Sequence, residues 1–189
     1  MDETTISLHP PLRRCWTKCG KRQLIPAPGS PQYLHVFGAY NWRNGQVTHC
    51  TSKHKNSDAF IAFLDHLLRQ HPRLKLILVL DNASYHRSKA VQAALSHWGD
   101  RLLLIWLPKY SPFLNPIERF WLHFKQLTVA NRLHRSLDDL KSLLIRSLPT
   151  RTRPIIPIDC FSWITFDWWL SHIHLRTSRH HSRRRRGGL

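Results

Sequence analysis

Two carboxylates stand where a chain can build acid chemistry. Asp81 directly follows an almost continuously apolar run, Leu74–Leu80, and Glu118 lies 37 positions later, where Asn115-Pro-Ile-Glu118 begins a helix. Acids that converge on one point repel each other unless a cation lies between them, and hard oxygen ligands favour Mg²⁺ or Mn²⁺. Such ions can activate a water or a 3′-hydroxyl against a phosphodiester. The pair therefore indicates metal-dependent chemistry on nucleic acid.

Each acid also has a purely structural interpretation. An Asp-Asn pair after a strand is ordinary turn chemistry, which would account for Asp81. Asn115-Pro-Ile-Glu118 matches a capping box, in which Glu118 would only satisfy the N-cap amide. Taken singly, Glu118 favours the structural interpretation. Taken together, the two acids favour function, because both fall at the same rim of the predicted sheet.

The elements that must position these acids follow from apolar periodicity. It predicts strands at Tyr33–Tyr40, Gln46–Thr51, Leu74–Leu80 and Arg101–Leu107, and helices at Ser57–Gln70, Ser88–Trp98, from Pro116 onward, and Ser136–Leu148. Residues 12–25, with a hairpin turn at Gly20, complete an antiparallel meander with the first two strands. The last two strands are joined by a helix, which predicts that they are parallel and covered on both faces. Ligands gather outside the carboxyl ends of such strands.

Cap residues refine the helix boundaries. We expect Ser57 and Asn115 to be N-caps and Pro72 to close the first helix. The stripe Ile117, Phe120, Trp121, Phe124 and Leu127 should be the buried side of the helix that carries Glu118. From Thr150 the helical period is lost, so we predict a catalytic domain over 1–148 and a Trp- and Arg-rich extension over 149–189, with a disordered end.

The charge of the chain agrees with nucleic acid as a partner. The 189 residues carry a formal charge of +18 and a pI near 10.9, a field that attracts polyanions. A basic tail at Arg183–Arg186 on a neutral domain is the alternative, but Lys and Arg are spread along the whole chain. The four cysteines form no CxxC pair, so reduced thiols are expected, and a zinc site at Cys15 and Cys19 lacks paired ligand spacing. Without a signal peptide or a long apolar run, we expect a cytosolic protein.

Two motifs carry a family resemblance. Leu80-Asp-Asn-Ala-Ser-Tyr-His86 and Leu107-Pro-Lys-Tyr-Ser-Pro-Phe-Leu-Asn-Pro-Ile-Glu-Arg-Phe-Trp121 resemble the mariner-type branch of the DDE transposases of bacterial insertion sequences. The second motif is long and specific, and the resemblance covers about residues 2–148. It implies an α/β, ribonuclease-H-like mixed sheet, with an antiparallel meander and parallel strands, flanked by helices.

The resemblance also implies an active site. Its triad of two Asp and one Glu falls on Asp2, Asp81 and Glu118, which would bind Mg²⁺ or Mn²⁺ as two ions, with Glu3 as the rival of Asp2. The implied reaction is hydrolysis at transposon ends, followed by attack of the freed 3′-hydroxyl on target DNA. Further residues would line the site or meet DNA, with a solvated-surface role as the alternative for the last three: Asn82, His86, Lys109, Tyr110 and Lys125.

Two departures from the family shape the expectations. In the family the first Asp ends a central strand that follows a helix-turn-helix region, whereas this sequence begins one residue before Asp2. We therefore expect the first strand to be largely missing, an upstream fragment to supply DNA recognition, and a dimer on DNA in the bacterial cytoplasm at the nucleoid. A nuclease on the same fold would cut without joining strands. A catalytically inactive DNA-binding remnant would bind DNA without regard to metal.

Overall fold

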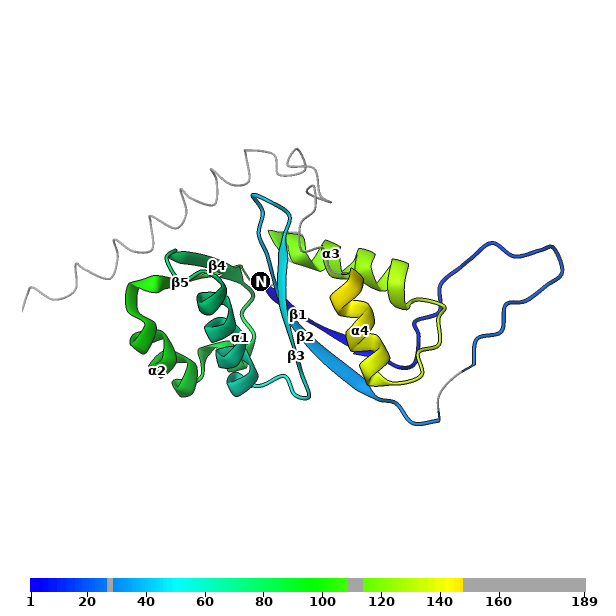
Figure 1. Cartoon of the computed structure of the whole chain (residues 1–189), viewed down its shortest axis with the longest axis horizontal. Coiled ribbons are helices and arrows are strands. Elements are labelled where there is room, and N and C mark those ends of the chain that lie inside the picture. Colours follow the sequence, from blue (N-terminus) through cyan, green and yellow to red (C-terminus); the bar gives the residue numbers. More distant parts are fainter. Residues whose placement is uncertain (27–28, 109–113, 148–189) are drawn as a thin grey trace, which may run out of the picture. The chain divides into compact units, whose positions relative to one another are not determined.

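The computed structural model describes residues 1–26, 29–108 and 114–147, all within one compact unit, Met1–Arg153 (Figure 1). Its elements in chain order are β1 (Asp2–Ser7), β2 (Tyr33–Tyr40), β3 (Val47–Ser52), α1 (Ser57–Gln70), β4 (Leu76–Leu80), η1 (Ser84–Arg87), α2 (Lys89–Trp98), η2 (Gly99–Arg101), β5 (Leu102–Trp106), α3 (Pro116–Phe124), η4 (Lys125–Val129) and α4 (Leu137–Ser147). The proposed extension 149–189, Lys109 and Tyr110 lie outside the described residues, so the domain boundary stays a prediction.

The antiparallel sheet has the order β1-β2-β3. Asp2 pairs with Gly38 across β1 and β2, and His35 pairs with Ser52 across β2 and β3. The predicted meander is therefore present, but its first strand is Asp2–Ser7 and not part of residues 12–25. The alternation of buried Thr4, Ile6 and Leu8 suits a half-buried strand. The turn at Gly20 is formed with φ 74°, yet no strand flanks it within 12–25.

The stretch between β1 and β2 leaves the sheet as a long excursion (Figure 1). Trp16 and Leu24 on this excursion are exposed to 102% and 88%, so they offer no inward face for strand pairing. Its base is closed by Asn131, which accepts from Arg13 N at 2.8 Å and donates from Nδ2 to Arg13 O at 2.9 Å. Leu8 N donates to Gln32 O at 3.0 Å. The excursion is thus tied down at its two ends.

The second sheet consists of β4 and β5, which are parallel, with Leu76 opposite Leu102 and Leu80 opposite Trp106. This confirms the predicted parallel pair and the connecting helix α2, which Ser88 caps through Val91 N at 3.3 Å. The expectation that helices cover both faces is wrong for the described residues, because Ile77 and Leu103 are 66% and 56% exposed. The reason is that α1 and α2 pack on the same face.

Two hydrophobic clusters flank the antiparallel sheet. One joins Ile6 and Val36 to α3 and α4, and the other joins Phe37 to α1, α2 and the parallel strands. Neighbouring residues of β2 therefore serve opposite faces, as the period of a strand requires. Figure 1 shows the same layers, with α1 and α3 on opposite sides of β1, β2 and β3. Within the described residues, no helix combines the length and apolar character needed to cross a membrane.

Two local predictions about the helices need correction. Asn56, not Ser57, is the N-cap of α1, and its Oδ1 accepts from Ala59 N at 3.0 Å. Leu127 is 59% exposed, although the apolar spacing predicts it in the buried stripe of α3. The cause is the π-helix η4 (Lys125–Val129), whose wider turn shifts the register so that Val129 is buried instead. The other four members of the stripe are buried as predicted.

The two sheets meet at the start of β1. The amino group of Met1 donates to Val79 O at 2.6 Å, and Asn115 Nδ2 donates to Met1 O at 3.1 Å. Among the described residues no strand ladder joins β1 to β4. The expectation of a largely missing first strand is wrong, because β1 is present over Asp2–Ser7 and pairs with β2 over its whole length. Asp2 is the first residue of β1 and not its last.

Candidate active site

Asp81 is the first residue beyond β4 and emerges at the carboxyl end of the parallel pair. Its Oδ1 accepts from Ala83 N at 3.2 Å and lies 3.3 Å from His86 Nδ1. The close contact with the His86 ring is the main cause that lowers the pKa of Asp81, against the opposing effect of burial. Its side chain is 50% exposed, and within the described residues Oδ2 makes no hydrogen bond. Asp81 is thus an ionised carboxylate with one oxygen held and one facing outward.

His86 lies behind Asp81 and is completely buried. Its Nε2 is 2.9 Å from Glu3 Oε1, so one imidazole contacts two acids. Burial lowers the pKa of His86, but Asp81 and Glu3 outweigh burial and raise it to about 9. The ring is therefore an imidazolium at neutral pH, with both nitrogens protonated. It connects β1 to the turn after β4.

Asp2 and Glu3 are separated by the alternation of β1. The Glu3 side chain is 4% exposed and pairs with His86. Asp2 is half-buried, and burial followed by the charge of Glu3 raises its pKa to about 7, with Glu118 and Asp81 adding to the rise. Asp2 therefore shares an electrostatic environment with the two acids singled out from the sequence. Of the two rivals, Asp2 is the one whose pKa is raised by Asp81 and Glu118, whereas Glu3 pairs with His86.

Glu118 lies in the first turn of α3 and is half-buried. Burial and then the charge of Asp81 raise its pKa. Asn115 occupies the N-cap position as predicted, but its side chain donates to Met1 O and does not cap the helix. Among the described residues the Glu118 carboxylate makes no hydrogen bond or ion pair. The capping box is therefore not formed, and the structural interpretation of Glu118 loses its support.

The acids fit a hard cation by their chemistry, but they are not assembled around one. Carboxylate oxygens are the ligands that Mg²⁺ and Mn²⁺ prefer. Burial raises the pKa of Asp2, and the negative charges of Glu3, Glu118 and Asp81 raise it further. In the part of the chain that the structure describes, no three His, Cys, Asp or Glu side chains are arranged to hold a metal ion. The predicted triad is thus electrostatically coupled without forming a coordination group.

Asn82 serves the scaffold. Its Nδ2 donates to Leu107 O, and its Oδ1 accepts from Arg87, whose guanidinium stacks 4.7 Å from the ring centroid of Trp106. These contacts tie the turn after β4 to the end of β5. Both ends of the Asn82 amide thus have a partner. Arg87 was missed in the sequence, because only the fold brings it against Trp106.

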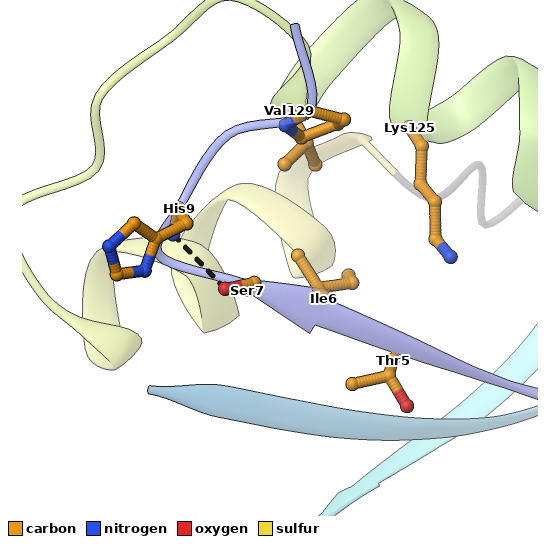
Figure 2. Close-up of a pocket in the computed structure, with 7 residues that line it drawn as sticks. Thr5, Ile6, Ser7, His9, Lys125 and Val129 are labelled. Atoms are coloured by element: carbon orange, nitrogen blue, oxygen red, sulfur yellow. Dashed lines mark hydrogen bonds between the residues drawn. The ribbon is translucent and has the colours of Figure 1, made fainter. Parts of the chain in front are cut away.

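Two lysines lie near the acids. Lys125, at the start of the π-helix, is half-buried; burial and then Lys55 lower its pKa, while Asp2 raises it. It lines a cavity of about 210 Å³ with Thr5, Ser7, His9 and other residues (Figure 2). Lys55 acts on both Lys125 and Asp81. Lys55 was missed, although the run Lys53-His54-Lys55 before α1 is a signal that could have found it.

An antiparallel meander followed by parallel strands, with acids at the strand ends, defines the ribonuclease-H-like fold. Solved structures of the Mos1 transposase share it. The paired-end complex with the left transposon end superposes with a TM-score of 0.61 at 17% identity, over 81% of this chain and 48% of that chain. The mariner Mos1 paired-end complex with Mg gives a TM-score of 0.58 at 20% identity, over 85% and 48%. The predicted fold class is confirmed.

The family follows from the sequence profile of the DDE superfamily endonucleases, which matches residues 1–141; this chain belongs to that family. It is 31% identical over 121 residues to the insertion element IS630 uncharacterised 39 kDa protein of Shigella sonnei, covering 64% of this chain and 35% of that protein. It is 26% identical over 109 residues to an uncharacterised protein of Sinorhizobium fredii, covering 57% and 77%. The chain spans about a third of the first relative and about half of the Mos1 chains. The resemblance to the DDE transposases is thereby confirmed.

Proposed function

We propose that this chain is the catalytic domain of a transposase, which cleaves DNA at transposon ends and transfers the strand to target DNA. The observation that carries the proposal is the gathering of three acids from separate elements, close enough for the charge of Asp81 to raise the pKa values of the other two. The charge of Asp81, which follows β4, raises the pKa values of Asp2 on β1 and Glu118 on α3, and Glu118 also raises that of Asp2. Perturbed acids that cluster in this way mark functional sites. Membership of the DDE endonuclease family supports the same assignment.

The three acids would hold Mg²⁺ or Mn²⁺, as two ions. When bound, such ions supply the activation of a water or 3′-hydroxyl and stabilise the leaving oxygen. The three carboxylates of this chain would contribute the negative charge that attracts and holds the ions. Asp81 is kept ionised by His86, whereas Asp2, with a pKa of about 7, is only partly ionised at neutral pH and would lose its remaining proton when a cation binds. Glu3 pairs with His86 and is not a ligand in this proposal.

DNA is the proposed substrate, and Lys125 and Lys55 are the proposed contacts to its phosphates. Two cations beside a group of acids can position a phosphodiester by its non-bridging oxygens. Lys125 is half-buried at a cavity, which favours a binding role over a solvated surface role (Figure 2). The formal charge of +18 supplies attraction over longer distances. Lys109 and Tyr110 stay predicted DNA contacts.

Recognition of particular transposon ends is a further part of the proposal. The Mos1 structures are paired-end complexes with transposon DNA, and this chain matches only 48% of the Mos1 chain. We therefore assign end recognition to a helix-turn-helix fragment beyond the matched residues. A dimer on DNA, acting at the nucleoid in the bacterial cytoplasm, completes the assignment.

One observation favours a second function, DNA binding without catalysis. Within the described residues the acids do not form a metal-binding group. An inactive DNA-binding protein with this fold needs no such group. The two functions differ in their response to metal and to the loss of one acid.

Nicking of supercoiled plasmid by the full chain with Mn²⁺ or Mg²⁺ tests the proposal, run beside Glu118→Gln. We expect metal-dependent nicking that Glu118→Gln abolishes and that Asp58→Asn, an exposed acid in the first turn of α1, leaves unchanged. Joined strands among the products distinguish a transposase from a nuclease. Equal behaviour of the parent and Glu118→Gln, with DNA still bound, would establish the binding function instead.

A further inference from the structure

Glu3 is a buried acid that the proposed chemistry does not use. Its side chain is 4% exposed, and in the described part of the chain its ion-pair partner is His86, itself 1% exposed, with Nε2 and Oε1 2.9 Å apart. Taking two ions out of water costs several kcal/mol for each ion, roughly, and is tolerated only when the pairing geometry is good. The two apolar clusters already pack the sheets and helices together. The residues around the pair indicate a role for it beyond packing.

The opposite edge of the imidazole faces Asp81. His86 Nδ1 lies 3.3 Å from Asp81 Oδ1, within ion-pair distance but without good hydrogen-bond geometry. The same oxygen accepts from Ala83 N at 3.2 Å. Two donors thus converge on Oδ1, and Oδ2 is left to the outside.

The ring of His86 is itself held from several directions. Its centroid lies 4.3 Å from that of Phe60 and 4.5 Å from that of Tyr85. Its backbone N donates to Ala83 O at 3.1 Å, and Ser57 Oγ donates to Tyr85 O at 3.1 Å. With Glu3 fixed on β1, the imidazole has little freedom to swing. The imidazole is therefore a rigid support beside the half-exposed side chain of Asp81.

We propose that Glu3 and His86 form a positioning pair that fixes Asp81 Oδ1 and so presents Oδ2 to a divalent cation. The inference rests on the proposed function, because it needs Asp81 to be a metal ligand. It assigns separate roles to adjacent residues of β1: Asp2 is a ligand, and Glu3 acts through His86. Outer partners that orient a ligand typically change metal affinity about 10–100-fold when they are lost. The alternative is that the pair only fastens β1 to the turn after β4.

Mn²⁺ affinity of the full chain separates these roles, measured from the electron paramagnetic resonance signal of free Mn²⁺. We expect Glu3→Gln and His86→Gln to weaken binding about 10–100-fold, and the exposed His97→Gln to leave it unchanged. Because the pair acts through Asp81, neither substitution should weaken binding further in an Asp81→Asn background. Folded variants, judged by circular dichroism, that bind within twofold of the parent would overturn the proposal. Losses that add to that of Asp81→Asn would overturn it too.

A second measurement needs no substitution, so it tests the role of the Glu3–His86 pair even if a variant does not fold. The ring nitrogens of His86 are followed by ¹⁵N NMR while the unmodified chain is titrated with Mg²⁺. We expect the Nδ1 signal to shift with the same saturation as metal binding, and the His97 signals to stay in place. Metal binding with no change at His86 overturns only the positioning pair. A chain that binds neither ion overturns the proposed metal-dependent function as well.

Discussion

Trp121 occupies the space in which a side chain on Gly38 would lie. A Cβ built on Gly38 would stand 2.4 Å from Trp121 Cζ2 and 3.2 Å from Ile117 Cδ1. Gly38 pairs with Asp2 across β1 and β2, and Ile117 precedes Glu118 on α3. The missing side chain lets α3 rest directly on the strand beside Asp2. One glycine therefore sets how closely the first and last acids of the proposed site approach.

Gly38→Ala should destabilise the chain by about 1–3 kcal/mol, because an added methyl overpacks a filled core. It should also reduce metal-dependent nicking, since α3 must move away from β1. Urea unfolding and plasmid nicking measure the two effects. Gly29→Ala is the matched control, because no atom lies within 4 Å of its Cβ position. Trp121→Leu should restore part of the lost stability in the Gly38→Ala background; an alanine tolerated without cost would contradict this packing.

His86 gives the stability of the chain a definite pH dependence. Its folded pKa of about 9 exceeds its ordinary value of 6.5, so the folded state binds the proton more tightly than the unfolded state. The stabilisation is complete below pH 6.5 and is lost as the pH rises through 9, with a ceiling of about 3 kcal/mol. Urea unfolding of the parent and of His86→Gln between pH 6 and pH 10 checks this. The stability difference should shrink with rising pH, and a constant difference would refute the assignment.

Asp2 and Glu3 should respond differently to the loss of charge. Asp2→Asn removes a proposed metal ligand and should lower the nicking rate more than about 100-fold. This exceeds the loss of about 10–100-fold that is typical when a residue that orients a ligand is removed. Glu3→Gln should fall within that smaller range and be partly rescued by raising the Mn²⁺ concentration. Initial nicking rates over a metal titration distinguish the two. The reverse order of severity would make Glu3 the ligand.

Lys125 and Lys55 should contribute to the salt dependence of DNA binding. Each phosphate contact contributes about −0.9 to the slope of log K against log salt on duplex DNA. Lys125→Ala and Lys55→Ala should each make the slope shallower by about one unit, whatever the DNA sequence. Fluorescence anisotropy over a series of salt concentrations measures this. Lys141, whose amine pairs with Asp138 on α4, is the control, and Lys141→Ala should leave the slope unchanged. If Lys125→Ala has the same slope as the parent chain, Lys125 does not contact a phosphate.

The parts of the structure that were predictable are those encoded locally. The apolar spacing of α1 and the strand–helix–strand unit are visible within short windows, which placed Asp81 and Glu118 at the ends of their elements. The pairing of Glu3 with His86 joins residues 83 positions apart, and no local pattern announces it. The first strand was misplaced for a similar reason. Its pairing with β2 spans the whole excursion, and a turn at Gly20 looks the same with or without flanking strands.

The sequence alone could not decide whether the side chain of Asn115 caps α3 or hydrogen-bonds to a distant part of the chain. Its backbone is at the N-cap, while its amide reaches Met1 O at 3.1 Å. Both uses suit asparagine, and the choice depends on which carbonyl the fold brings near. The π-turn at Lys125–Val129 is equally silent in the sequence, since its residues keep an ordinary helical composition. Nonlocal packing thus decided what periodicity left open.

The closure at Asn131 has a consequence for how the fold accommodates length. Because the base of the excursion is held by Asn131 and by the bond from Leu8 to Gln32, residues inserted further out lengthen a loop that is already closed. The entropy of such a loop grows only logarithmically, so that doubling its length costs about 0.6 kcal/mol. Insertions and deletions between Arg13 and Gln32 are therefore nearly neutral for stability. The length of the excursion can change in related sequences while the pairing of β1 with β2 stays the same.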